Sequence, residues 1–242
     1  MQRKVFLLVT VLMLLCFSAA AQEESTPSSS TDYSIVAIVN GEIITQDTLA
    51  TSAQLVQIFQ VIIQEFPTFG QTLFATPEGD ALLYAYQLGV LDTIISSRLV
   101  IQQAEQHDIA PDEKELEEQV EQQLNQIIEQ NQLTIEQIET ILSEQGSSLD
   151  EYRQMMRESF AEQSMAQDLY TLITQPVAIS SEEISAYYQD HEEEFAAEDG
   201  SISPLDEVRE QIHEDLLENA QADAWNTWFD DVKDKAEIEI FF

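Results

Sequence analysis

The chain has 242 residues, of which 46 are acidic and only 9 are basic, so its formal net charge is −37 at pH 7. Nucleic acids and anionic membrane surfaces are bound through Lys and Arg, and the charge therefore excludes both as partner classes. The acidic residues are interleaved with apolar positions, which is typical of a solvated acidic surface suited to a saline exterior. A dedicated cation-binding role is the alternative interpretation of this acidity.

The N-terminal residues have the pattern of a cleaved secretory signal. Two basic residues precede an apolar stretch over 5–17, and an Ala-x-Ala pattern follows at 19–21. The stretch is shorter than the ~20 residues of a membrane-spanning helix, which favours cleavage over a retained anchor. Lipidation of Cys16 is a third alternative. We expect a signal peptide over residues 1–21, no stable membrane insertion after its cleavage, and a disordered, serine-rich linker over residues 22–32.

The segment over residues 34–49 predicts a β-hairpin that leads into a helix. Two apolar runs flank Asn40-Gly41, and both residues of this pair tolerate the positive φ of a type I′ turn. The hydroxyl of Thr45 is then placed to accept hydrogen bonds from the free N–H groups of the following helix.

Most of the remaining chain is predicted to be helical. Gly and Pro are scarce, at 6 each, and residues that favour helices dominate. Apolar spacing and capping residues predict helices from 46 to about 65, one ending near 107, one starting at 112, one from 134 to 146, one from 148 to about 174, a short one from 180 to 188, and a long one after Ser203-Pro204. Phe66 and Pro67 are expected to end the first of these, and a loop is predicted up to about Gly79.

The C-terminus predicts a strand, because Ile238, Ile240 and Phe242 alternate with other residues. A terminal strand needs a partner for its backbone groups, and the only other predicted strands lie over residues 35–44. We therefore predict that the two ends of the chain pair in one small sheet. This pairing would close residues 33–242 into a single, mainly α-helical domain.

Several segments carry motifs that can be compared with known families. They are the Val-Asn-Gly turn at 39–41 ahead of a helix, VIQQAEQHDIAPD over 100–112, LSEQGSSLDEYRQMMR over 142–157, ISSEEISAYYQDHEEEF over 179–195, and a closing helix and strand over 204–240. In this order they resemble the motifs of the SurA and PrsA group of exported folding factors. The resemblance implies a SurA-like, trigger-factor-like helical chaperone core on the periplasmic or extracellular side of the cytoplasmic membrane, with unfolded client polypeptides as partners.

The chain departs from this group at one place. The group usually carries a parvulin-type prolyl isomerase domain after the segment that matches residues 179–195. Here only residues 196–203 separate Phe195 from the closing helix, and a domain of ~50 residues or more does not fit there. The resemblance therefore implies a chaperone that binds unfolded or nascent polypeptides without catalysis and without a cofactor. The alternative is a prolyl cis–trans isomerase with a degenerate site.

No catalytic or metal-binding residues are predicted, because the histidines are scattered and no hydrolase, nucleotide or calcium motif is present. An adaptable apolar surface would suit a chaperone. The candidate peptide-binding residues are Tyr152, Met155, Met156, Phe160 and Met165. The alternative is that these side chains belong to an ordinary core, and the oligomeric state stays open.

Overall fold

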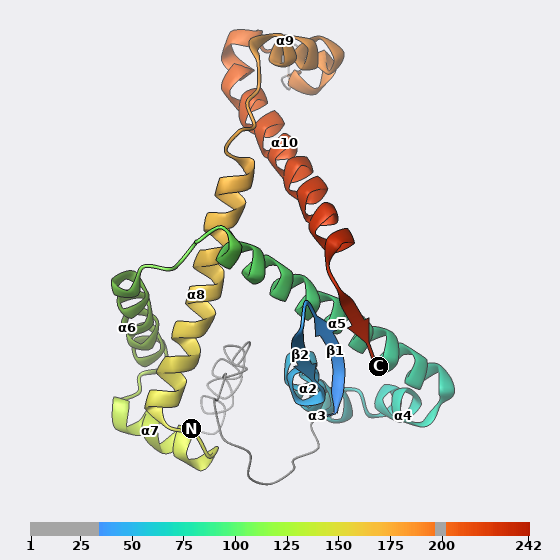
Figure 1. Cartoon of the computed structure of the whole chain (residues 1–242), viewed down its shortest axis with the longest axis vertical. Helices are drawn as coiled ribbons and strands as arrows, with labels where there is room; N and C mark the ends of the chain where they lie inside the picture. The colour runs from blue at the N-terminus through green and yellow to red at the C-terminus, as the bar shows by residue number, and fades with distance from the viewer. Residues whose placement is uncertain (1–33, 197–201) are drawn as a thin grey trace. The chain divides into compact units, whose positions relative to one another are not determined.

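The computed structural model describes residues 34–196 and 202–242 (Figure 1). The predicted signal peptide, the Cys16 site and the linker lie outside these described residues, as does most of the shortened segment over 196–203. Within them the chain is mainly helical, with one small antiparallel sheet, which confirms the predicted fold class. The contacts divide the chain into two compact units. The first contains the described residues up to Ala166 together with Ala236–Phe242, and the second is Gln167–Lys235. The predicted boundaries of a single domain stay a prediction.

The sheet of the first unit joins the two ends of the described chain. Strands β1 (Ile35–Val39), β2 (Glu42–Thr45) and β3 (Ile238–Ile240) are arranged in the order β2-β1-β3, and both pairs are antiparallel. Figure 1 shows the dark-red arrow of β3 beside the blue hairpin. The register places Val39 opposite both Glu42 and Ile238. The predicted pairing of the chain ends is therefore confirmed.

The predicted turn is also confirmed, since Asn40 and Gly41 have φ values of 50° and 89°. Both lie in the left-handed region that a type I′ turn requires. Thr45 caps the next helix as expected, because its hydroxyl oxygen accepts a hydrogen bond from the Thr48 N–H at 3.1 Å.

Four helices follow the hairpin, where the sequence predicted two and a loop. They are α2 (Gln46–Ala53), α3 (Leu55–Glu65), α4 (Pro67–Ala75) and α5 (Pro77–Gln106). The predicted single helix is split at Gln54, whose backbone is left-handed with φ 48°. The predicted loop from 66 to 79 is wrong. The predicted helix end near residue 65 is confirmed, because α3 ends at Glu65, directly before Phe66 and Pro67. Pro67 and Pro77 each stand at the start of a further helix, where a missing N–H costs nothing, so helices follow where a loop was predicted.

Helix α5 supplies the core beneath the sheet. Leu91, Ile95 and Leu99 lie on one of its faces and are buried, and α5 contacts both β1 and α2. The buried Gln102 extends this face, and its side-chain amide donates to the Val39 carbonyl at 3.2 Å and to the Glu42 carboxylate at 2.7 Å. The hairpin is thereby fixed to α5 by polar as well as apolar contacts.

A second apolar cluster of the first unit lies among α6 (Glu113–Asn131), α7 (Ile135–Glu144) and α8 (Leu149–Thr174). Its buried members are Val120, Leu124, Ile127, Ile138, Leu142, Leu149, Tyr152 and Met156. The predicted starts of α6 and α7 are confirmed, because Asp112 caps the first and Thr134 forms a capping box with Gln137 at the second. Gly146, with φ 80°, follows the end of α7 as expected.

The second unit contains the C-terminal part of α8, α9 (Ser181–Asp190), the short 3-10 helix η1 (Glu192–Phe195) and α10 (Leu205–Lys235). Ser180 and Glu183 form the predicted capping box of α9. Helices α9 and α10 contact each other. Further along, Trp225 of α10 lies 5.3 Å from Tyr170 and 4.8 Å from Trp228, measured between ring centroids.

Candidate functional site

The most apolar helix of the first unit buries none of its side chains. Seven of the eleven residues of α3 are apolar, in the sequence LVQIFQVIIQE, yet none of them is buried. A helix of this composition is normally covered by other elements. Within the described first unit, α3 is therefore a surface element with the composition of a core element.

The neighbouring helices extend this exposed apolar character. Eight large apolar side chains between residues 56 and 86 are 40% to 65% exposed, namely Val56, Val61, Ile63, Phe66, Phe69, Leu82, Tyr84 and Tyr86. They belong to α3, α4 and the first turns of α5, or to Phe66 between α3 and α4, and α4 contacts both α3 and α5. We call these eight residues the α3–α5 apolar surface. Single exposed apolar residues are ordinary, whereas many of them on helices that contact one another are the composition expected of an interaction surface.

Close packing holds α3, α4 and α5 together behind these side chains. The rings of Phe59 and Phe74 meet edge to face, with centroids 4.5 Å apart. A Cβ atom on Gly79 would lie 1.9 Å from the Leu73 carbonyl oxygen, so only glycine permits this approach of α5 to α4. Gly70 is also buried. The exposed side chains thus project from a well-packed scaffold.

Two tyrosines link this scaffold to the rest of the first unit. The Tyr86 hydroxyl donates a hydrogen bond to the Ala53 carbonyl at 2.9 Å. The ring of Tyr84 stacks on that of Phe242, with centroids 5.3 Å apart and an interplanar angle of 9°. The C-terminal residue therefore packs at the edge of the α3–α5 apolar surface.

This surface also has few charges. From residue 48 to residue 91 the only charged side chains are Glu65, Glu78 and Asp80, although the whole chain has 46 acidic residues. A weakly charged apolar area on a chain of net charge −37 is suited to apolar polypeptide segments.

The predicted peptide-binding residues lie elsewhere, on α8. Tyr152 and Met156 are 2% and 1% exposed and belong to the buried cluster with α6 and α7. Met155 and Phe160 are partly buried and pack against this cluster. Met165 is partly exposed. The structure gives the first two a place in the core, and the binding role of the five residues stays a prediction.

Sequence reasoning missed the α3–α5 apolar surface. The signal was present, because seven of the eleven residues of α3 are apolar and only the face with Gln57, Gln60 and Gln64 is polar, so the apolar side is too broad to be buried against one neighbour. The predicted loop over residues 66–79 is the reason, because a loop gives no periodicity from which the exposure of Phe69 on α4 could be expected.

The titratable groups of the described residues are mostly spread along the helices. Among these residues no three or more His, Cys, Asp or Glu side chains are grouped to hold a metal ion. Two carboxyl groups in the first turns of α8 and α9 have a lowered pKa. That of Glu183 is lowered because the Ser180 hydroxyl and backbone N–H donate to the carboxylate, and Ser148 has the same effect on the pKa of Glu151. These shifts reflect capping, which is a structural role.

Comparisons with known proteins agree with this architecture. Residues 1–166 match the family described as SurA-like N-terminal domain. The foldase protein PrsA of Clostridium kluyveri is 26% identical over 173 residues, covering 71% of this chain and 50% of the relative. The foldase protein PrsA of Caldanaerobacter subterraneus is 26% identical over 201 residues, covering 81% of this chain and 54% of the relative. The chain thus spans about half the length of these relatives.

A solved structure gives the same fold. It comes from work that describes PEB4 and the periplasmic protein Cj1289 of Campylobacter jejuni as two structurally related SurA-like chaperones. The match has a TM-score of 0.51 at 12% identity and covers 86% of this chain and 99% of that one. At this identity the likeness concerns the fold alone.

Proposed function

The chain belongs to the SurA-like N-terminal domain family, and from this premise we propose that it is an exported chaperone that binds unfolded polypeptide segments without catalysing a reaction. The observation that carries the proposal is the α3–α5 apolar surface. It presents aliphatic and aromatic side chains together, on helices fixed by close packing. Such a surface can hold many different apolar sequences, because burial of apolar area has no directional requirement.

The strength of such binding can be bounded. Complete burial of a Val, Leu, Ile or Phe side chain stabilises by about 1.5–3 kcal/mol. Covering a few of the eight side chains would therefore give weak binding once the ordering of the client is subtracted. Weak, reversible binding is what a chaperone needs in order to release its client.

The absence of catalysis is proposed from the segment that follows η1. Ala196 and Ile202 form an antiparallel bridge, and the Ser203 N–H donates to the Phe195 carbonyl at 2.9 Å. The residues on either side of this segment therefore lie next to each other. The number of residues between them is far smaller than the ~50 residues of a small domain. This supports a chaperone core without an inserted isomerase domain.

The five α8 residues are proposed as a second contact region. Met155, Phe160 and Met165 are the members that keep some exposed area, and Met side chains adapt to varied partners. Tyr152 and Met156 would support them from the core. The signal pattern at the N-terminus supports a location on the periplasmic or extracellular side of the cytoplasmic membrane. Among the described helices none is long and apolar enough to cross a membrane.

An aggregation assay tests the proposal. The chain from residue 22 onward should suppress aggregation of a denaturant-unfolded client at comparable molar ratio. The triple variant Val61→Ser/Phe66→Ser/Phe69→Ser should lose most of this activity, because it removes apolar area from the surface. The matched control Ile135→Ser/Leu172→Ser/Ile202→Ser changes residues of similar type, 37% to 43% exposed, outside the surface, and should retain it.

The same protein should not accelerate proline-limited refolding beyond the uncatalysed time of ~10–100 s. Acceleration that one substitution abolishes would favour the isomerase alternative. Equal loss of holding activity in both triple variants would contradict the assignment to the α3–α5 apolar surface.

A further inference from the structure

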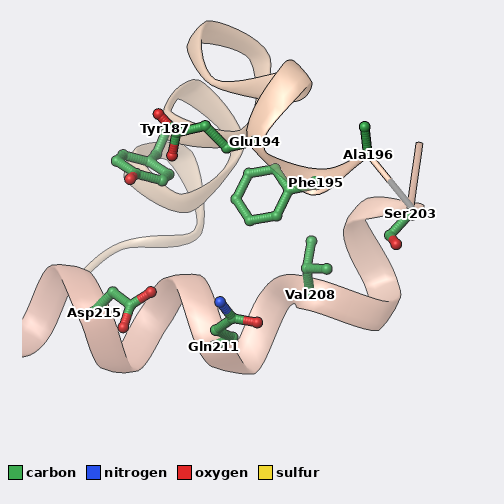
Figure 2. A pocket seen from close by; sticks show the side chains of 8 residues that line it. All are labelled: Tyr187, Glu194, Phe195, Ala196, Ser203, Val208, Gln211 and Asp215. Carbon is green, nitrogen blue, oxygen red and sulfur yellow. The ribbon is translucent and has the colours of Figure 1, made fainter. Parts of the chain in front are cut away.

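The second unit contains a pocket that the proposed function does not use. It lies between the α9–η1 segment and the first turns of α10, and its volume is about 300 Å³. Figure 2 shows Val208, Gln211 and Asp215 in a row along α10, facing the segment that carries Tyr187 and Phe195. The three α10 residues share one helical face because they are spaced by three and four positions. A pocket of this size is at the lower end of the range for small-ligand sites.

Hydrogen bonds and ring contacts hold the walls of this pocket in place. The Tyr188 hydroxyl donates to the Ser203 carbonyl at 2.8 Å, which ties α9 to the start of α10. The centroid of the Phe195 ring lies 5.5 Å from that of the Tyr188 ring and 6.5 Å from that of the Tyr187 ring. His191 stacks on Tyr187 with centroids 4.1 Å apart. The aromatic walls are therefore fixed by neighbouring rings.

The lining combines aromatic rings with negative charge. Tyr187 and Phe195 supply the rings, and Glu194 and Asp215 supply two carboxylates. Arg209 is the only Lys or Arg from residue 158 to residue 232. One of its guanidinium nitrogens lies 3.8 Å from a carboxylate oxygen of Asp206. The pocket carboxylates are thus without a strong cationic neighbour in the sequence around them, and an anionic ligand would be repelled.

These features select one class of ligand. A positive group is attracted by the two carboxylates, and the face of an aromatic ring also attracts a cation, most strongly an organic one that can lie against it. A calcium ion would need six to eight oxygen ligands, which two carboxylates and aromatic walls do not supply. We propose that this pocket binds an alkylammonium or guanidinium group, with Glu194 and Asp215 as counter-ions and Tyr187 and Phe195 as aromatic walls. The group is the side chain of a Lys or Arg in a polypeptide, or a free small amine.

Titration calorimetry and NMR on the chain from residue 22 onward test this proposal. The probes are N-acetyl-arginine amide, N-acetyl-lysine amide and the uncharged N-acetyl-glutamine amide. Because both carboxylates are exposed, we expect Kd values on the order of millimolar for the two cations. The two cations should shift amide resonances of residues 187–195, and the glutamine compound should shift none of them. Equal binding of the glutamine compound would overturn the proposal.

A pair of double variants separates a specific site from general charge attraction. Glu194→Gln/Asp215→Asn should weaken binding of the arginine compound by about fivefold or more. The control Glu182→Gln/Asp223→Asn removes the same charge from exposed positions on α9 and α10 and should leave the affinity unchanged. Equal weakening in both variants would overturn the proposal. So would calcium chloride if it produced the same shifts in residues 187–195 and displaced the arginine compound at constant ionic strength.

Further arms identify the ring contribution and the source of the group. Phe195→Leu keeps an apolar wall but removes the aromatic face, and should weaken binding about twofold to fivefold; unchanged affinity would overturn the role of the ring.

An unstructured peptide with one central Arg is compared with its Gln counterpart and with the free arginine compound. Tighter binding of the Arg peptide than of the free compound assigns the pocket to polypeptides, and weaker binding assigns it to free amines. If the cations bind here while holding activity is absent, the pocket stands and the proposed chaperone function fails.

Discussion

The side-chain oxygen of Asn40 accepts a hydrogen bond from the backbone N–H of Glu237 at 2.8 Å, although the two residues are 197 positions apart. In return the Asn40 N–H donates to the Glu237 carbonyl, also at 2.8 Å. The Asn40 amide further donates to the Gln102 side chain at 2.8 Å. One turn residue therefore connects the hairpin to the C-terminal strand and to α5.

The first prediction concerns this residue. Asn40→Gly keeps the left-handed backbone accessible but removes both side-chain hydrogen bonds, and should lower the free energy of unfolding by about 1–2 kcal/mol. Asn40→Asp keeps the acceptor for the Glu237 N–H, but its second carboxylate oxygen would face the Gln102 side-chain oxygen, so it should cost at least as much. Urea unfolding of the two variants measures the difference. Equal stability of Asn40→Gly and the unmodified chain would contradict the connecting role.

The second prediction concerns the C-terminal strand. Deletion of residues 238–242 removes the partner of β1 and the stack of Phe242 on Tyr84, so the first unit should lose stability as a whole. Thermal unfolding should show a clearly lower melting temperature and increased binding of a hydrophobic dye. Phe241→Ser is the control, because this side chain is 56% exposed, and its melting temperature should hardly change. A deletion variant that melts with the full chain would show that the pairing contributes nothing.

The third prediction compares two glycines of α5. A Cβ on Gly79 would lie 1.9 Å from the Leu73 carbonyl oxygen, whereas one on Gly89 would have no neighbouring atom within 4 Å. Gly79→Ala must therefore separate α4 from α5, at a cost of about 1–3 kcal/mol. Gly89→Ala should instead stabilise the helix by about 0.5–1 kcal/mol. Calorimetry should show opposite changes in melting temperature, and the same sign for both would refute the close approach.

The fourth prediction concerns salt. A chain of net charge −37 has many like-charge neighbours, each costing ~0.2–0.5 kcal/mol on a helix at low ionic strength. At 1 M salt the Debye length falls to ~3 Å, so this repulsion is screened. The melting temperature should therefore rise steeply from low to molar sodium chloride. A melting temperature that stays constant across this range would remove the link to a saline exterior.

A charge variant sharpens the salt test. Arg157 of α8 forms ion pairs with Glu113 and with Glu117 of α6, the latter at 3.3 Å. Arg157→Gln leaves these carboxylates facing each other, so its melting temperature should fall at low salt and approach that of the unmodified chain at 1 M. Lys235→Gln is the control, because its ion pair with Asp231 is long, at 3.9 Å, and exposed.

Features set by a few neighbouring residues could be predicted from the sequence. Asn40-Gly41 specified its turn through backbone preference alone, and the capping boxes at Thr134 and Ser180 were recognisable because the two partners are three residues apart. The pairing of β3 with β1 followed from elimination, since few other strand-forming segments were available. The helix that starts at Pro67 was not predictable in the same way, because a proline after a helix is compatible with a following loop and with the start of a new helix.

The sequence by itself thus determined the hairpin, most helix boundaries, the acidity and the resemblance to exported folding factors. Only the tertiary structure decided which apolar residues are covered. Tyr152 and Met156 of α8 are buried because α6 and α7 supply partners, whereas Phe66 and Val61 stay exposed because no described element of the first unit covers them. Periodicity reveals which side of a helix is apolar, but burial depends on contacts with residues far away in the chain. The pocket between η1 and α10 has the same origin, since Glu194 and Asp215 meet only when the two elements pack.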